Sequence, residues 1–494
     1  MGARKSGILL HITSLPGSEG IGTFGKGAFR FVDFLAETGQ KIWQILPLGP
    51  TGFGNSPYQC YSAFAGNIYL IDLTKLLEDG LLNRGDFKGT PQAGKSRVGF
   101  GKVIAWKMPV LRKAFQKFQK NNYNSFHNEY QQFLKEHNWW LQDFALFMSA
   151  REHFNGEQWA SWPDELKFRT PVGIHKYQTK LEADVNFWKF IQFQFFRQWF
   201  ALKKYANTKG VQIFGDMPLY VSADSADVWS NTDIFLLDKN LKPKQVGGVP
   251  PDYFSDDGQL WGNPVFNWKR LQERDFDWWM ARLHFNLNLF DKIRIDHFRG
   301  LESFWSVPAG EATAQNGKWV RAKGFDMLTK LRGQIGHLPL IAEDLGIITP
   351  EVEKLRLDFG LPGMKVLQFA FLTDAANEYL PHNYTRNFVA YTGTHDNNTT
   401  LGWLKSLEGE EKSMVKSYLK GTRKNALKNA IEITWSSTAN IAIAPFQDIL
   451  QLGSKSRMNT PGTANGNWSW RFQWKQVKSK RKVFLKDITK KYNR

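Results

Sequence analysis

The stretch IRIDHFRG (residues 293–300) joins a strand-like half to a cluster of charged and imidazole side chains. Its first half alternates apolar and charged residues, which is the period of a β-strand. Its second half continues with Asp296, His297 and Arg299, at the point where the strand should end. A core strand gains nothing from burying such groups. The stretch therefore predicts a strand that presents catalytic side chains at its carboxyl end.

Similar short apolar runs, each ending in polar or Gly residues, recur along the chain. They are residues 7–17, 41–50, 211–221, 292–300, 338–346, 363–371, 388–397 and 441–450. Helical patterns lie between them, such as FRFVDFLAETG (29–39), which ends at a Gly. Eight strand candidates that alternate with helices predict a parallel (β/α)₈ TIM barrel, and we expect residues 1–494 to form one catalytic domain.

Two intervals are longer than a barrel crossover needs, and we expect them to be insertions. Residues 51–210 are mainly helical in pattern, and the dense aromatics of 187–206 predict a buried helix there. Residues 222–291 contain GGVPPDYFSDDGQLWGNP (247–264), which is rich in Gly, Pro, Asp and Asn with interleaved aromatics. This composition predicts a loop that forms a lid over a site.

The composition is that of a globular protein with a basic surface. Mean hydropathy is −0.43, the net charge is +19, and no apolar run is long enough for a membrane span. In the Lys-rich C-terminal segment Phe484, Leu485, Ile488 and Tyr492 recur at helical spacing, so we interpret it as an amphipathic helix with a solvated basic face. No nucleic-acid recognition motif accompanies the charge. The single cysteine, Cys60, favours a reducing compartment, and we expect the cytoplasm.

The sequence contains no pattern typical of a metal or nucleotide site. The histidines do not cluster at ligand spacing, and one cysteine cannot build a Cys-rich site. The segment GIGTFGKG (20–27) nearly matches a P-loop, but Gly27 stands where the Mg²⁺-binding Ser or Thr belongs. We therefore expect no cofactor and no metal.

Carboxylates at three strand ends are the strongest functional signal. Asp296, Glu343 and Asp396 each follow a different strand candidate. Any one of them could be a helix N-cap, but three together favour a catalytic site at the barrel mouth. Glycosidic cleavage needs two such acids, one as nucleophile and one as acid/base. Arg294 shares a strand face with Asp296, so its charge favours the ionised carboxylate that a nucleophile requires.

Several motifs together resemble the amylomaltases, the 4-α-glucanotransferases or disproportionating enzymes of the α-amylase superfamily. The resemblance covers nearly the whole chain and its motifs stand in the family's order. They are SGILLHITSLPG (6–17), SPYQCYSAFAGN (56–67), GDMPLYV (215–221), KIRIDHFRG (292–300), IAEDLG (341–346), TGTHDN (392–397) and NTPGTANGNWSWR (459–471).

The resemblance implies a role for each site residue. Asp296 is then the nucleophile, Glu343 the acid/base and Asp396 the acid that stabilises the transition state. The other implied substrate-binding residues are Arg294, His297 and His395, which grip the sugar before the scissile bond, with Ser56, Tyr58, Asp216, Trp261 and Asn467. The resemblance also places the lid over the acceptor site and implies no cofactor and no metal. Unlike in typical amylases, we expect no C-terminal β-sandwich after the barrel.

The implied function is that of a cytoplasmic 4-α-glucanotransferase. It would move α-1,4-glucan segments of starch, glycogen or maltodextrin between maltooligosaccharides, or onto glucose, through a covalent glycosyl-enzyme. We expect no nucleic-acid partner, no membrane, and a monomer or weak homodimer. A glucan hydrolase of the same fold and a non-catalytic glucan- or nucleic-acid-binding protein remain the alternatives.

Overall fold

An eight-stranded parallel sheet forms the centre of the computed structural model, which describes residues 4–91, 96–120, 126–251, 255–371, 377–420 and 423–494. The strand order is β10-β11-β12-β1-β2-β3-β6-β9. The strands are β1 (Lys5–Leu9), β2 (Ile42–Gln44), β3 (Gln212–Met217), β6 (Lys292–Ile295), β9 (Leu340–Ala342), β10 (Gly363–Val366), β11 (Phe388–Tyr391) and β12 (Ile441–Pro445).

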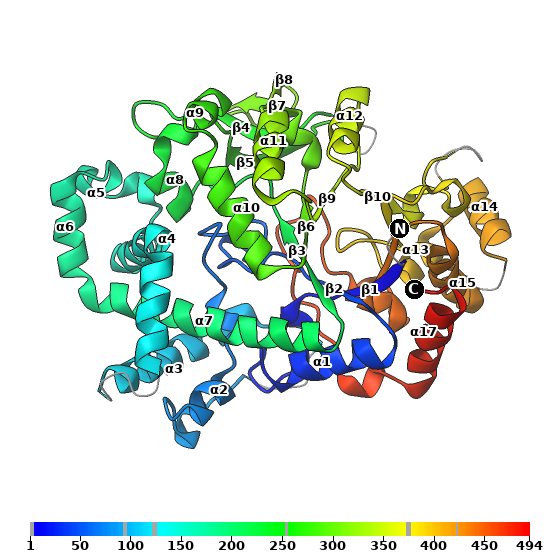
Figure 1. The fold of residues 1–494 in the computed structure, drawn as a ribbon, viewed down its shortest axis with the longest axis horizontal. Coiled ribbons are helices and arrows are strands. Elements are labelled where there is room, and N and C mark those ends of the chain that lie inside the picture. Colours follow the sequence, from blue (N-terminus) through cyan, green and yellow to red (C-terminus); the bar gives the residue numbers. More distant parts are fainter. Residues whose placement is uncertain (1–3, 92–95, 121–125, 252–254, 372–376, 421–422) are drawn as a thin grey trace.

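The two edges of this sheet meet, so the sheet is a nearly closed barrel. The amide N–H of Ala342 at the end of β9 donates to the carbonyl of Pro362, just before β10, at 2.8 Å. Each barrel strand coincides with one of the eight apolar runs, except that β1 begins two residues before its run, and the (β/α)₈ prediction is confirmed. Helices surround the barrel (Figure 1).

The helices that pack on the barrel follow the predicted patterns. The pattern at 29–39 is α1 (Lys26–Glu37), after which Gly39 turns the chain with φ 77°. The aromatic segment 187–206 lies in α7 (Glu182–Thr208), whose Phe190 and Phe195 are fully buried. The others that contribute here are α10 (Asp277–Leu289), α11 (Gly324–Ile335), α12 (Pro350–Asp358), α13 (Thr400–Ser406), α14 (Gly409–Leu419), α15 (Arg423–Ser436) and α17 (Ser479–Lys491).

Between β2 and β3 the described chain is mainly helical. These helices extend to one side of the barrel (Figure 1), where α7 packs against β3 and α1, and α3 and α4 pack against α7. They are α2 (Leu73–Glu78), α3 (Phe100–Lys120), α4 (His127–His153), α5 (Asp164–Lys167), α6 (Pro171–Lys180) and α7.

A second sheet of four antiparallel strands lies above the barrel, and it corrects our prediction for residues 247–264. Its order is β5-β4-β7-β8, with β4 (Gln245–Val249), β5 (Gln259–Pro264), β7 (Ser303–Pro308) and β8 (Lys318–Arg321). We predicted a loop, whereas the segment is a β-hairpin. Of the aromatics assigned to it, Tyr253 and Phe254 lie outside the described residues.

The loop prediction is wrong because Gly247 and Gly248, which are typical of turns, lie inside strand β4. A Cβ at Gly247 would lie 2.7 Å from the ring of Tyr220, and one at Gly248 would lie 2.5 Å from the carbonyl oxygen of Gln259. Glycine is therefore required inside β4 because neighbouring groups approach its backbone closely.

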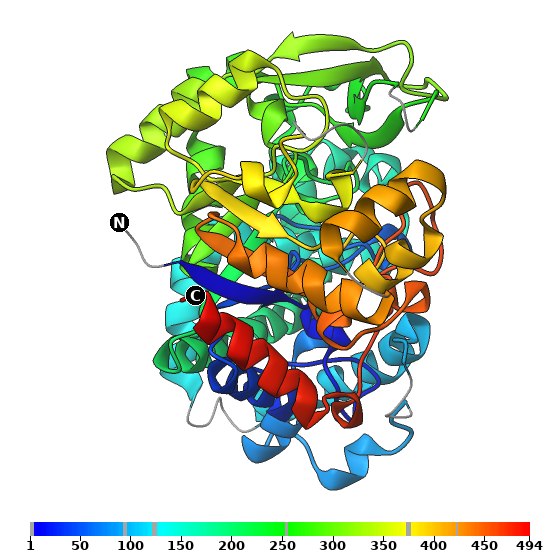
Figure 2. The ribbon, with the colours of Figure 1, turned by 90° about the vertical axis from the view of Figure 1, so that its right-hand side faces the viewer.

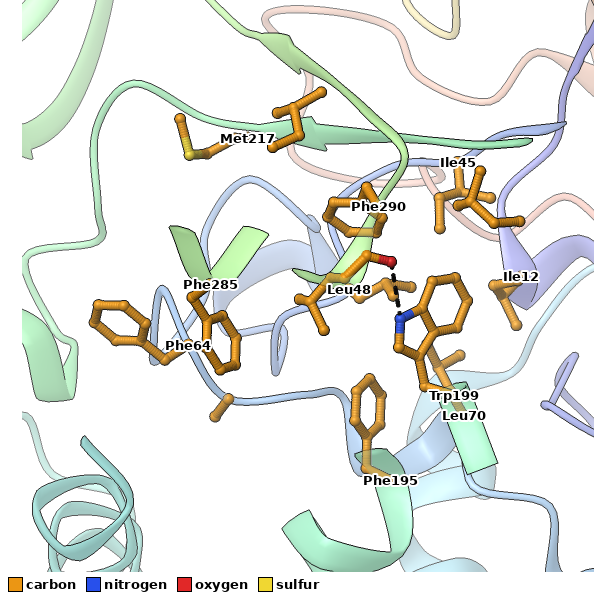
Figure 3. Close-up of a cluster of buried hydrophobic side chains, with 14 of the residues drawn as sticks. Ile12, Ile45, Leu48, Phe64, Leu70, Phe195, Trp199, Met217, Phe285 and Phe290 are labelled. Atoms are coloured by element: carbon orange, nitrogen blue, oxygen red, sulfur yellow. Dashed lines mark hydrogen bonds between the residues drawn. The ribbon is translucent and has the colours of Figure 1, made fainter. Parts of the chain in front are cut away.

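Packing outside β3 fixes the direction of the site residues on that strand. A Cβ at Gly215 would lie 2.2 Å from the ring of Phe290, so the absence of a side chain lets Phe290 press against the strand. Figure 3 shows Phe290 beside Trp199, whose indole N–H donates to the carbonyl of Leu289 at 3.3 Å. Side chains alternate along a strand, so Asp216 points to the opposite side, into the barrel. No helix in the described ranges is long and apolar enough to cross a membrane.

Candidate active site

Neighbouring strands bring the predicted acids to one end of the barrel. Strands β3, β6 and β9 are adjacent in the sheet. Asp216 is the second-last residue of β3, whereas Asp296 and Glu343 directly follow β6 and β9. The ladder continues past the strand ends: the N–H of Asp296 donates to the carbonyl of Met217 at 3.0 Å, and that of Glu343 to Ile295 at 3.1 Å. The three carboxyl groups therefore share the carboxyl-terminal mouth, as predicted for such a barrel.

Arg294 links two of these carboxylates. Its Nε lies 3.0 Å from both carboxylate oxygens of Asp216, and its Nη2 lies 2.6 Å from Oδ1 of Asp296. The hydroxyl of Tyr58 donates to Asp216 at 2.7 Å. Burial alone would lower the pKa of Arg294, but Asp216 and Asp296 raise it, so the guanidinium stays charged. The contact predicted between Arg294 and Asp296 is present.

Glu343 has a different environment from Asp296. Its Oε2 accepts from the backbone N–H of His297 at 2.7 Å, and its Oε1 from that of Leu345 at 3.1 Å. His297 has a left-handed backbone, with φ 54° and ψ 48°, at the turn where its N–H meets the carboxyl group. None of the ion pairs in the described part of the chain includes Glu343. Burial raises its pKa to about 7, opposed by Arg294 and these backbone N–H groups.

Asp296 is a second buried carboxyl group, and it interacts with Glu343. Burial raises the pKa of Asp296 also; Arg294 opposes this rise, while Asp216, Glu343 and Asp396 add to it. Two buried carboxyl groups that interact hold one proton between them over a wide pH range. Burial outweighs Arg294 and raises the pKa of Asp296 to about 8, but the hydrogen-bonded ion pair with Arg294 favours the charged form of Asp296.

Asp396 lies in the loop after β11, and each of its two carboxylate oxygens contacts a different side chain. Its Oδ1 accepts from the carboxamide Nδ2 of Asn459 at 2.6 Å, and its Oδ2 lies 3.3 Å from Nε2 of His395. Burial lowers the pKa of His395, which favours the neutral imidazole. The His395 ring stacks on Tyr58 with centroids 5.3 Å apart and planes 11° apart. Asp396 is thereby joined through His395 and Tyr58 to the Arg294 network.

Trp261 brings the second sheet to the site. It lies on β5 with its ring edge-on to the imidazole of His297, at a centroid distance of 4.8 Å. Burial lowers the pKa of His297 to about 3, and its Nε2 has no hydrogen-bond partner among the described residues. A neutral imidazole with a free ring nitrogen can bind a hydroxyl group.

Two predicted binding residues serve local structure. The Ser56 hydroxyl accepts from the N–H of Tyr58 at 3.2 Å and so shapes the turn that presents Tyr58. Asn467 accepts from the N–H of Thr460 at 3.0 Å and donates to the carbonyl of Thr463 at 2.9 Å, and no contact in the described residues joins it to the three acids.

The sequence analysis missed Asn459 and Trp468. Trp468 packs on Tyr58 and His395 at centroid distances of 5.7 and 5.9 Å. Both residues stand in NTPGTANGNWSWR, the motif from which only Asn467 was chosen. The motif pointed to this segment, but the spacing of its asparagines does not show which carboxamide contacts Asp396.

These features define a class of enzyme. A (β/α)₈ barrel whose mouth holds one carboxylate paired with Arg294, a second carboxyl group of raised pKa and a third acid is typical of enzymes that cleave glycosidic bonds with two carboxyl groups.

Comparison with known proteins gives the particular family. A family described as 4-alpha-glucanotransferase matches residues 10–477. The 4-alpha-glucanotransferase of Clostridium butyricum is 47% identical over 98% of both chains, and that of Thermus thermophilus is 47% identical over 95% of this chain and 94% of its own. The solved amylomaltase of Streptococcus agalactiae in complex with acarbose superposes with a TM-score of 0.96, at 42% identity and 99% coverage of both chains. The chain therefore belongs to the 4-alpha-glucanotransferase family, and it is an enzyme of that activity.

Proposed function

We propose that the enzyme transfers α-1,4-glucan segments by using Asp296 as nucleophile, Glu343 as acid/base and Asp396 as transition-state stabiliser. The observation that carries this assignment is the unequal environment of the first two acids. Asp296 is paired with Arg294 at 2.6 Å, whereas in the described part of the chain Glu343 accepts from the backbone N–H groups of His297 and Leu345. Burial raises the pKa of both carboxyl groups, so the feature that separates the proposed nucleophile from the proposed acid is the contact of Asp296 with Arg294, which favours a carboxylate.

The proposed reaction consists of two successive displacements at the anomeric carbon. A carboxylate oxygen of Asp296 attacks the anomeric carbon, the bond to the glycosidic oxygen breaks, and Glu343 gives its proton to that oxygen. The 4-hydroxyl of an acceptor then attacks the same carbon, its proton passes to Glu343, and the bond to Asp296 breaks. Asp396 accepts hydrogen bonds from sugar hydroxyls, and these strengthen as the ring becomes positively charged.

Trapping the covalent intermediate tests these roles. In Glu343→Gln an α-maltosyl fluoride donor still reacts, because fluoride leaves without a proton, but the acceptor lacks a base. We expect a maltosyl adduct that mass spectrometry of proteolytic fragments places on Asp296. An adduct on another carboxyl group, or none despite fluoride release, would contradict the assignment.

We propose α-1,4-glucans and maltooligosaccharides as donors and acceptors, with glucose as the smallest acceptor. Support comes from the substrate class in the family's name and from Trp261, whose ring stands next to His297 where a sugar could stack. Transfer differs from hydrolysis in conserving the number of reducing ends. Maltotriose incubated with the enzyme should therefore give longer and shorter chains at constant total reducing ends, whereas a hydrolase would raise that total.

Three further expectations belong to this proposal. The single cysteine supports a reducing compartment, and we propose the cytoplasm. The absence of a recognition motif supports a solvent-facing role for the +19 charge, without a nucleic-acid partner. We propose a monomer or weak homodimer, which sedimentation at several protein concentrations would test.

A further inference from the structure

We propose that Asn459 is a positioning residue that fixes the carboxylate of Asp396 for catalysis. The inference rests on the proposed role of Asp396 and goes beyond it, because it assigns a function to a residue on a different segment of the chain. That segment, residues 457–468, follows β12 and is called the strap below.

The strap holds the β11 loop by three hydrogen bonds around Asp396. The carboxamide of Asn459 donates to Oδ1 of Asp396 at 2.6 Å. The backbone N–H of Asn459 donates to the carbonyl of His395 at 3.1 Å, and the guanidinium of Arg457 donates to the carbonyl of Asp396. The backbone and the carboxylate of Asp396 are thus both fixed from the same side.

The carboxylate of Asp396 has few other restraints. Its side chain is 42% exposed, and in the described part of the chain its other oxygen has the longer contact of 3.3 Å to His395. An exposed carboxylate with one long contact can rotate about its last bond, since that torsion has a broad energy minimum. The short bond from Asn459 removes this freedom and turns Oδ2 toward His395 and the site.

Hydrogen bonds within the strap and the packing of Trp468 restrain the part of it that carries Asn459. The amide of Asn467 spans it by accepting from the N–H of Thr460, and the N–H of Trp468 donates to the carbonyl of Met458 at 2.8 Å. The Trp468 ring then packs against Tyr58 and His395. Asn459 is therefore fixed relative to the same rings that border Asp396.

A positioning role predicts a specific kinetic pattern. Misplacing a catalytic group by about 1 Å lowers turnover about 10²-fold, so we expect Asn459→Ala to lower kcat by about 10- to 100-fold with little change in KM. Asn459→Asp keeps the shape but replaces the donor by a second carboxyl group, and we expect a loss at least as large. Affinity for a protonated iminosugar, which resembles the charged transition state, should fall in parallel with kcat.

Asn387→Ala is a matched control. Asn387 precedes β11 at the opposite end of the same strand, and its carboxamide donates to the carbonyls of Gly360 and Leu361 at 3.3 and 3.1 Å. This variant loses a comparable number of hydrogen bonds but should keep kcat, KM and iminosugar affinity. Rates are expressed per active site, counted from the burst of fluoride released from α-maltosyl fluoride, so that partial unfolding does not imitate a catalytic loss.

A double-mutant cycle decides the inference. If Asn459 acts through Asp396, adding Asn459→Ala to Asp396→Asn should change kcat by less than about 2-fold. An Asn459→Ala enzyme with normal kcat, or an equal loss in both backgrounds, would overturn the inference while leaving an inactive Asp396→Asn in place. Normal turnover in Asp396→Asn would instead overturn the proposed role of Asp396, and the inference with it.

Discussion

At the scale of single residues, the chemistry depends on the different surroundings of Asp296 and Glu343. Asp296 faces a guanidinium, which Asp216 in turn holds by two contacts of 3.0 Å. Glu343 faces two backbone N–H groups, which stabilise a charge less than a guanidinium does. Arg294 therefore favours the charged form of Asp296 by direct contact, and Asp216 keeps Arg294 in place.

Replacing the nucleophile tests this arrangement most directly. Asp296→Asn keeps the size of the side chain but gives an amide, which is a poor nucleophile. We expect kcat/KM for maltotriose to fall by about 10³-fold or more, as in enzymes that lose a group of a cooperating set. Binding of maltooligosaccharides, followed by calorimetry, should persist. A variant with near-normal turnover would rule out Asp296 as nucleophile.

The pH dependence of kcat/KM should report the proton on Glu343. Because its pKa is raised to about 7, the group is protonated below that pH and loses its proton as the pH rises through it. Bond cleavage in a glucan needs this proton, so kcat/KM for maltotriose should fall on the alkaline side near pH 7.

A donor with a good leaving group provides the comparison. α-Maltosyl fluoride does not need the proton, so its kcat/KM should keep its value further into the alkaline range. The same alkaline fall for both donors would mean that another group titrates there.

The residue pairings were only partly predictable from the sequence. Arg294 and Asp296 are two positions apart on one strand, and the alternation of a strand places them on one face, so this contact could be predicted. The bond from His297 N–H to Glu343 could not, because it depends on a left-handed backbone at His297, which a non-glycine residue rarely adopts. The Asn459–Asp396 bond joins positions 63 apart, and no local pattern encodes it.

At the scale of elements, the predicted lid is a β-hairpin that belongs to the second sheet. Strand β4 pairs with β5 on one side and with β7 on the other, so the hairpin is an integral part of a sheet. Propensity could not reveal this, because Gly247 and Gly248 in β4 and Gly262, Asn263 and Pro264 in β5 disfavour strands. The same sheet places Trp261 against His297.

Trp261 should favour a sugar acceptor over water. The glycosyl-enzyme must survive in the presence of water at ~55 M until an acceptor arrives, which requires exclusion of water and orientation of the 4-hydroxyl. We expect Trp261→Ala to lower the ratio of glucan transfer to net formation of reducing ends, with Trp261→Phe closer to the parent enzyme.

The ratio matters more than either rate. A stable Trp261→Ala enzyme in which transfer and hydrolysis fall equally would mean that the ring supports activity without selecting the acceptor. Trp319→Ala on β8 is a suitable control, because that ring is 39% exposed and is stacked on Arg299 rather than on His297.

At the scale of the whole molecule, the basic C-terminal helix closes the ring of helices around the barrel. Figure 2 shows α17 beside the first strand, with both ends of the chain nearby. Lys482 pairs with Glu37 at the end of α1, and Lys491 pairs with Glu432 on α15, each at 2.7 Å. The helix and its amphipathic pattern were predictable from spacing. Its position between the first and the last barrel helices was not, because it depends on contacts with residues far away in the sequence.

Barrel closure by α17 leads to a prediction about stability. Leu485 is fully buried under this helix, whereas Val483, two residues earlier, is 56% exposed. Leu485→Ala leaves a cavity and should lower the free energy of unfolding by about 2–5 kcal/mol. Val483→Ala removes an exposed side chain from the same helix and should change it by less than about 0.5 kcal/mol. Thermal unfolding of both variants gives the comparison, and kcat per active site well below the unfolding temperature should match the parent in each. Equal unfolding temperatures for the two variants would show that α17 adds little to the closed barrel, and an equal loss of kcat would show that it acts on the site instead.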